Sequence, residues 1–221
     1  MRKVFIILLT IFLPLYLLLK GVEINAFNKK FYLKSYERYR IPEITGKTLR
    51  ELDGITDEFF KYLKGKSNEE VLKPFFNEKE IVHMEDVNFL FKYGIVLKRI
   101  SFILSLLTII TIFYYDEVQR VSRGVFYGNF IWWSLILVLF ILSSIDFNKY
   151  FTYFHRIFFN NDLWLLDPET DLLIQMLPEG FFIDIFKRIV LFFLSMLAII
   201  QMTSYILMKK GKDSGGRIIN F

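Results

Sequence analysis

The stretch Val125-Phe-Tyr-Gly-Asn-Phe-Ile-Trp-Trp-Ser-Leu-Ile-Leu-Val-Leu-Phe-Ile-Leu-Ser-Ser-Ile145 contains no charged residue. About 20 apolar residues are enough for a helix to cross the hydrocarbon core of a bilayer. Three further apolar runs, at residues 4–22, 93–115 and 185–208, have comparable lengths. The sequence therefore predicts a mainly α, polytopic membrane protein with four transmembrane helices.

Two of these runs carry basic residues near one end: Lys98 and Arg99 in the second, Lys187 and Arg188 in the fourth. A transmembrane helix tolerates such residues when their long side chains reach the lipid headgroups. Both runs are therefore predicted to be transmembrane helices.

The first run has two interpretations. Arg2 and Lys3 followed by an apolar stretch also describe a secretory signal peptide, with Ile24-Asn25-Ala26 as a cleavage site. The usual pair of small residues before the cut is missing, which favours a retained helix. Retention and cleavage both stay open.

The short basic segments indicate the orientation, because cytoplasmic loops carry an excess of Lys and Arg. Arg2, Lys3, a loop at 116–124 and a tail at 209–221 supply these charges, so both termini are expected in the cytoplasm. Residues 23–92 and 146–184 then lie outside the cytoplasm. The former is expected to form a small α/β cap and the latter an active-site segment.

The composition supports membrane insertion and excludes several chemistries. Hydrophobic residues make up 54% of the chain and aromatic residues 19%, and there is no cysteine. A disulfide framework, a thiolate nucleophile and a cysteine-based zinc site are therefore excluded. The formal charge of +5 does not indicate nucleic-acid binding, because the basic residues lie beside apolar runs where topology explains them.

Within the cap, the aromatic-rich residues 31–41 alternate roughly and suggest a strand or an extended stretch. Thr48 and Glu51 form a capping-box pattern that predicts a helix to Leu63. Its buried side is expected to hold six residues: Leu49, Leu52, Ile55, Phe59, Phe60 and Leu63. A second capping box, Asn77-x-x-Glu80, opens a further helix for which Gly94 offers a point to bend.

The chain has two histidines, His83 and His155, which flank the pair of spans 93–115 and 125–145. Because two spans return the chain to the side it left, both histidines are expected on the same side of the membrane. Asp86 follows His83 by three residues and shares its helix face, so its carboxylate could orient the imidazole. The alternative for Asp86 is a solvated charge on a helix surface.

The segment after the third run surrounds His155 with aromatic and polar residues. The polar residues are Arg156, Asn160, Asn161 and Asp162, and the aromatic residues are Phe151, Tyr153, Phe154, Phe158 and Trp164. An interfacial aromatic belt would explain the rings. It would not explain the polar residues among them, which are costly in an apolar environment unless paired or used.

Several catalytic motifs are missing. There is no His-Glu-x-x-His, no calcium-loop spacing, no Gly-x-Ser-x-Gly and no phosphate-binding glycine loop, and His155 is followed by Asn160 instead of the Asp of a His-x4-Asp motif. A metal held by both histidines and a carboxylate such as Asp86 or Asp162 stays open.

Two motifs resemble the lipoprotein intramolecular transacylase family. They are Phe75-Phe-Asn-Glu-Lys-Glu80-Ile-Val-His83-Met-Glu-Asp86 and Phe154-His155-Arg156, continuing through Asn161-Asp162-x-Trp164, Asp167-Pro168 and Leu177-Pro178-Glu179 to Phe182. The resemblance implies a bundle of four helices in the bacterial cell membrane, with an extracytoplasmic active site. It also implies transfer of the sn-2 acyl chain of a diacylglyceryl-modified cysteine of a lipoprotein to that cysteine's α-amino group, which gives a lyso-form lipoprotein.

That reaction fits the available residues. One histidine can accept the ammonium proton while the other stabilises the oxyanion or protonates the leaving glycerol oxygen, and the sequence does not assign the two roles. Arg156, Asn160 and Asn161 are candidate donors, and the aromatic residues would exclude water. No cofactor and no metal are expected, and the partners are lipoproteins and membrane lipid. Two alternatives stay open: a metal-dependent membrane hydrolase and a non-enzymatic assembly factor.

Overall fold

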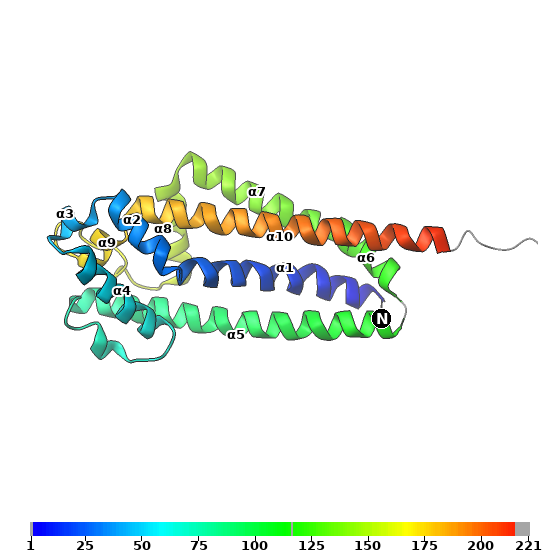
Figure 1. Ribbon diagram of the computed structural model, residues 1–221, viewed down its shortest axis with the longest axis horizontal. Coiled ribbons are helices and arrows are strands. Elements are labelled where there is room, and N and C mark those ends of the chain that lie inside the picture. Colours follow the sequence, from blue (N-terminus) through cyan, green and yellow to red (C-terminus); the bar gives the residue numbers. More distant parts are fainter. Residues whose placement is uncertain (1, 116, 215–221) are drawn as a thin grey trace, which may run out of the picture. The chain divides into compact units, whose positions relative to one another are not determined.

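The computed structural model describes residues 2–115 and 117–214, and these are almost entirely helical (Figure 1). Residues 116 and 215–221, which belong to the predicted loop and tail, lie outside the described residues. The helices are α1 (Arg2–Ala26), α2 (Lys29–Arg38), α3 (Ile41–Thr45), α4 (Leu49–Leu63), the 3-10 helix η1 (Glu69–Val71), α5 (Glu78–Tyr114), α6 (Val118–Gly128), α7 (Phe130–Ile145), α8 (Phe147–Phe158), α9 (Leu172–Met176) and α10 (Glu179–Ser214).

Four helical stretches are long and apolar enough to cross a membrane: Arg2–Ala26, Glu78–Tyr114, Val118–Ile145 and Glu179–Lys209. Each contains one of the apolar runs identified in the sequence, which confirms the prediction of a mainly α protein with four spans. The helix through the second run, α5, is continuous across Gly94, where the sequence offered a bend.

The chain forms two compact units. The first contains the described residues of 1–22, 95–141 and 189–221, and the second contains residues 23–94 and 142–188. The chain passes from one unit to the other within α1, α5, α7 and α10.

In the first unit, α1 and α6 approach each other closely through two glycines. A Cβ atom at Gly124 would lie 2.5 Å from Cδ1 of Ile6, and one at Gly128 would lie 2.8 Å from Cγ2 of Thr10. Small residues spaced four apart allow such backbone proximity between helices in membranes. The sequence did not indicate this pair, because Gly124 falls in the predicted loop at 116–124, whereas the structure places both glycines in α6.

The junction of α6 and α7 carries a polar contact inside this unit. Asn129 is 1% exposed, and its Nδ2 donates to Oε1 of Gln201 at 2.9 Å. Gln201 Nε2 donates in turn to the carbonyl of Phe126 at 3.0 Å. A buried amide needs such partners, since an unpaired polar group in an apolar environment is costly.

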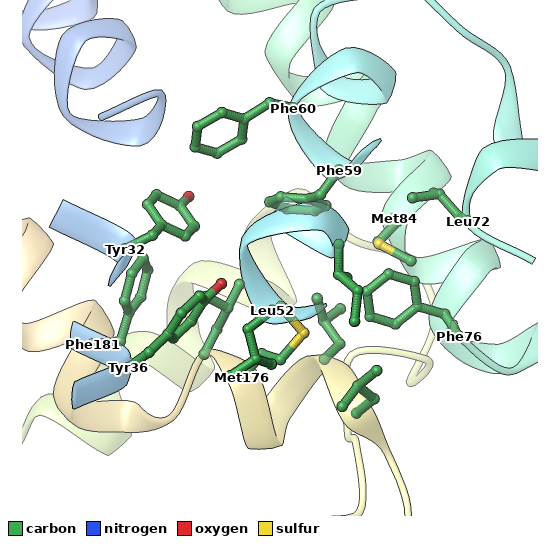
Figure 2. Packing of buried hydrophobic residues seen from close by; sticks show 14 of the residues in the cluster. Tyr32, Tyr36, Leu52, Phe59, Phe60, Leu72, Phe76, Met84, Met176 and Phe181 are labelled. Carbon is green, nitrogen blue, oxygen red and sulfur yellow. The ribbon is translucent and has the colours of Figure 1, made fainter. Parts of the chain in front are cut away.

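The second unit has a large hydrophobic core built by α2, α3, α4, α9 and the starts of α5 and α10. Figure 2 shows this core at close range, with Tyr32, Tyr36 and Phe181 beside one another and Leu52 near Met176. The capping box at the start of α4 is present, with Thr48 accepting from Glu51 N and Glu51 accepting from Thr48 N.

Five of the six residues expected on the buried side of α4 are buried, and Leu49 is the exception. Leu49 occupies the first position of the helix and is exposed. The last turns therefore contribute more to the core than the first.

The α/β cap predicted for residues 23–92 is wrong, because no strand occurs in residues 2–115 and 117–214. The stretch expected to be extended forms α2 and α3 instead. Asn28 caps α2 by accepting from the N–H of Phe31 at 3.1 Å. Phe31, Tyr32 and Tyr36 are buried together, which is the spacing of one helix face and not of a strand.

The close approach of α6 to Thr10 gives a prediction about Gly128. We expect Gly128→Ala to lower the apparent unfolding temperature in scanning fluorimetry, because overpacking against a stiff β-branched side chain costs about 1–3 kcal/mol. Gly54→Ala is the matched control, since Gly54 lies inside α4 with nothing within 4 Å of an added Cβ. That variant should be neutral or stabilising. Equal effects of the two substitutions would contradict the close contact.

Candidate active site

His83 and His155 lie next to each other in the second unit. Their ring centroids are 6.1 Å apart and the ring planes differ by 34°. Both side chains are buried, at 7% and 6% exposure. His83 lies near the beginning of α5 and His155 in the last turn of α8. This proximity agrees with the prediction that the two histidines lie on the same side of the membrane.

The start of α5 is fixed by the predicted second capping box. The N–H of Asn77 donates to Oε2 of Glu80 at 2.7 Å, and the N–H of Glu80 donates to Oδ1 of Asn77 at 3.0 Å. These bonds satisfy backbone donors that an α-helix leaves unpaired at its N-terminus. His83 follows Glu80 by three residues, so the capping box also fixes the position of its imidazole.

Glu80 and Asn77 bond to a distant part of the chain as well. The other oxygen of Glu80 accepts from the N–H of Leu173 in α9 at 2.6 Å, and Asn77 Nδ2 donates to Asp171 at 2.8 Å. Burial acts to raise the pKa of Asp171, but hydrogen bonds from Asp167 N–H, Asn77 and Thr170 outweigh it and lower that pKa. The ionised carboxylate therefore holds the segment that follows α8 against α5.

One ring nitrogen of His155 is held by its own helix. Its Nδ1 lies 2.7 Å from the carbonyl oxygen of Phe151. Because a carbonyl only accepts, Nδ1 carries the proton in the neutral ring, which leaves Nε2 with a free lone pair. Burial lowers the pKa of His155 below its ordinary value, and the bond to Phe151 opposes that shift without reversing it. The imidazole is therefore neutral at neutral pH and can accept a proton.

Aromatic rings surround the two histidines. Trp164 stacks on His155 with centroids 4.8 Å apart, and Phe151 and Phe154 contact the same ring at 4.3 and 5.4 Å. Of the five aromatic residues predicted from the sequence, these three contact a histidine. No ring contact within the described ranges joins Tyr153 or Phe158 to either histidine, and both are exposed.

Phe159 is an aromatic residue of the site that the sequence did not single out. It is 7% exposed, and its ring lies 5.4 Å from the centroid of His83 and 5.4 Å from that of His155. Its spacing of one helical turn from His155 could have indicated a shared face. The stretch contains so many aromatic residues that spacing alone did not single it out.

Asp86 bonds to the second segment and not to His83. Its carboxylate accepts from Nδ2 of Asn161 at 2.8 Å, and Oδ1 of Asn161 accepts from the N–H of Leu163 at 3.0 Å. No hydrogen bond joins Asp86 to His83 in the part of the chain that the structure describes. Asn161 thus ties the loop after α8 to the helix that carries His83.

The remaining predicted polar residues lie at the surface around this pair. The side chains of Arg156, Asn160 and Asp162 are exposed. They are therefore available to a bound molecule, and they do not form part of the buried contacts between the histidines.

Two buried polar atoms of the site have no hydrogen-bond partner among the described residues. They are Nδ1 of His83 and Nε1 of Trp164. Such atoms are costly when unpaired. Polar groups of a bound substrate would pair with both atoms. Nδ1 of His83 accepts or donates a hydrogen bond according to the tautomer of the ring, whereas Nε1 of Trp164 only donates one.

The histidines do not form a cluster of metal ligands. No group of three or more His, Cys, Asp or Glu side chains that could hold a metal ion occurs in residues 2–115 and 117–214. Asp86, a carboxylate that the sequence offered as a third ligand, is bonded to Asn161.

Comparisons with known proteins point to one family. Residues 7–182 match the family model described as lipoprotein intramolecular transacylase Lit. No curated protein matches. The fold is similar to that of the membrane-integral lipoprotein intramolecular transacylase Lit from Bacillus cereus, with a TM-score of 0.85 at 21% identity, covering 96% of this chain and 98% of that chain.

Two structures of the Bacillus cereus protein with a substituted histidine are also similar. The histidine-to-arginine form gives a TM-score of 0.80 at 21% identity, covering 97% of this chain and 95% of that chain. The histidine-to-alanine form gives 0.78 at 20% identity, covering 96% of each chain. At these identities the likeness concerns the fold.

The buried state of His155 gives a prediction about pH. Because its pKa is lowered by folding, the unfolded chain binds a proton there at a pH where the folded protein does not. Its contribution to stability is complete above the ordinary histidine pKa of about 6.5 and is lost as the pH falls below that value. We expect the apparent unfolding temperature to fall more steeply between pH about 7.5 and about 5 in the native protein than in His155→Asn. Parallel pH profiles would show that His155 is not held neutral.

Proposed function

The chain belongs to the lipoprotein intramolecular transacylase family, and on that premise we propose that it moves the sn-2 acyl chain of a diacylglyceryl-modified cysteine to the α-amino group of the same cysteine. The product is a lyso-form lipoprotein. The protein is an acyltransferase and a multi-pass membrane protein. The observation that carries the proposed chemistry is the pair of buried imidazoles 6.1 Å apart, one of which has a fixed tautomer.

His155 is proposed as the base. An α-amine has a pKa of about 7.7–8.0 and attacks an ester only when it is neutral. The free lone pair of Nε2 in His155 can take the proton that the amine loses, because Nδ1 is committed to the carbonyl of Phe151. The neutral amine nitrogen forms a bond to the sn-2 carbonyl carbon as Nε2 of His155 removes one of its two protons, which gives a tetrahedral oxyanion with an uncharged nitrogen.

His83 is proposed to serve the oxygen side of the reaction. A hydrogen bond from its imidazole would stabilise the oxyanion, and a proton from it would go to the glycerol oxygen when the ester C–O bond breaks. In the same step the protonated His155 returns its extra proton to His83, so that neither ring is left as an anion. One proton thus moves from amine to glycerol oxygen, and both rings end as they began.

Positioning supplies the rest of the proposed catalysis. Donor and acceptor belong to one molecule, so the enzyme must fold the amine onto the ester and hold it there, which can contribute several kcal/mol. Trp164, Phe151 and Phe159 enclose His155 with apolar surface. Such an enclosure excludes the water that would hydrolyse the ester instead.

The site is proposed to face the outside of the bacterial cell membrane, with both termini in the cytoplasm. The basic residues Arg2, Lys3, Arg120 and Arg123 support this orientation, because cytoplasmic segments are enriched in Lys and Arg. The substrate, a membrane-anchored lipoprotein, would then enter from the outer leaflet. Arg156 and Asn160 are exposed and can bind its polar groups.

The two histidines give the central prediction. We expect purified protein, incubated with a synthetic diacylglyceryl-cysteine lipopeptide, to yield fragments that carry an acyl group on the cysteine nitrogen. The parent mass does not change, so fragmentation by mass spectrometry is the measurement. His83→Ala and His155→Ala should lower the rate roughly 10²–10⁴-fold, the usual contribution of an acid or base.

Folding of each variant is checked by its gel-filtration profile and unfolding temperature. Full transfer by a folded His155→Ala protein would remove the proposed base. Release of free fatty acid in place of N-acylation would instead indicate a hydrolase.

The aromatic enclosure gives a separate prediction. We expect Trp164→Ala to slow transfer by about 10-fold or more and to increase ester hydrolysis, because water gains access and the stacked ring of His155 loses its support. Tyr153→Ala is the comparison, since Tyr153 contacts neither histidine, and it should lose much less activity. Trp164→Phe keeps the enclosure but removes the Nε1–H donor, so it should fall between the two. Equal rates for all three variants would show that the enclosure plays no part.

A further inference from the structure

A cavity lies against α5, on the side of the helix away from the histidines. It has a volume of about 430 Å³ and is lined by Tyr62, Ser67, Glu69, Glu85, Asn88 and Lys92, among others. With 100° of rotation per residue, Glu85, Asn88 and Lys92 share one face of the helix, roughly opposite His83. All of these residues belong to the second unit. The reaction proposed above makes no use of this cavity.

Two polar atoms of the cavity lack partners. Asn88 is 4% exposed, and its Nδ2 donates to the carbonyl of Tyr62 at 3.1 Å. Its Oδ1 and the Oγ of Ser67 are buried without a hydrogen-bond partner among the described residues. A buried acceptor without a donor costs free energy, so this site favours a ligand that donates hydrogen bonds.

The charges of the cavity are separated along it. Glu69 and Glu85 supply two carboxylates near Tyr62; burial raises the pKa of the Tyr62 hydroxyl, and the two carboxylates add to that rise. Lys92 lies two helical turns after Glu85, and no ion pair between Lys92 and either carboxylate occurs in residues 2–115 and 117–214. A ligand that carries an ammonium group at one end and an anionic phosphate at the other would match this arrangement.

The cavity also adjoins an exposed aromatic pair. Phe89 and Tyr93 are each 60% exposed, and their rings lie 4.3 Å apart. They stand where the charged start of α5 gives way to its apolar run. Aromatic residues gather at the level of the lipid headgroups. This aromatic pair favours a membrane lipid over a free metabolite as the ligand.

We propose that this cavity binds the headgroup of a zwitterionic phospholipid with a primary ammonium, such as phosphatidylethanolamine. The three N–H groups of the ammonium donate to Asn88 Oδ1, Ser67 Oγ and the carboxylate of Glu85, the negative charge of Glu69 lies nearby, and the phosphate pairs with Lys92. The bound lipid is not the substrate. It anchors the start of α5, and so the helix that carries His83, at a fixed depth in the headgroup layer.

Native mass spectrometry of the full chain in detergent tests the proposal. The protein is incubated separately with phosphatidylethanolamine, phosphatidylcholine and phosphatidylglycerol that have identical acyl chains. We expect retained adducts of phosphatidylethanolamine to exceed the others. Phosphatidylcholine carries the same charges but has no N–H donor, and phosphatidylglycerol has no cation.

Substitutions in the cavity separate this site from nonspecific lipid binding. Glu85→Gln and Lys92→Gln should each retain phosphatidylethanolamine roughly tenfold less well, the loss expected for one charge-assisted hydrogen bond. Ser67→Ala should weaken retention with little risk to folding. Glu78→Gln is the matched control on α5 outside the cavity and should bind normally.

Two outcomes would overturn the proposal: equal retention of the three lipids, or unchanged retention in Glu85→Gln, Lys92→Gln and Ser67→Ala. Acyl transfer on the lipopeptide is measured with the same protein preparations before phospholipid is added. This transfer should persist in Ser67→Ala. Failure of the native protein to transfer would contradict the proposed function and leave the lipid result to stand by itself.

Discussion

The carboxylate of Glu80 joins the two chain segments that carry the histidines. One of its oxygens accepts from Asn77 N at 2.7 Å and the other from Leu173 N at 2.6 Å, and the side chain is 1% exposed. A buried carboxylate is costly unless its oxygens are paired. Few other placements of α9 relative to the start of α5 would pair both oxygens of Glu80. It begins α5, fixes α9 beside it and thereby brings His83 next to the segment that follows His155. Together with the Asn77–Asp171 and Asp86–Asn161 hydrogen bonds, this side chain holds the two segments in place.

The elements that could be predicted from the sequence are those encoded by local patterns. Long apolar runs indicated the four spans, and the pairs Thr48–Glu51 and Asn77–Glu80 indicated two helix starts, because a capping box is complete within four residues. Counting the spans between His83 and His155 predicted that they lie on the same side of the membrane, and it left open whether the two rings touch. Such inferences need no knowledge of which surfaces pack together.

The elements that were missed depend on tertiary contacts. Phe31, Tyr32 and Tyr36 suggested a strand because aromatic residues favour sheets, and only the core of the second unit shows that they share a helix face. Phe159 could not be separated from its aromatic neighbours until its contacts to both histidines were known. Asp86 shares the face of His83 as expected, but its partner, Asn161, comes from a segment 75 positions further along the chain.

The bond from Nδ1 of His155 to the carbonyl of Phe151 links the winding of α8 to the tautomer of the imidazole, two properties that are usually independent. Both residues lie in α8, one helical turn apart, so the winding of that turn sets the distance between the two atoms. If the turn loosened, the ring could take the other tautomer and Nε2 would become a donor. The state of the proton is thus an attribute of the helix and not of the side chain alone. A lipid or peptide that pulled on the end of α8 would alter the acid–base chemistry without touching the imidazole.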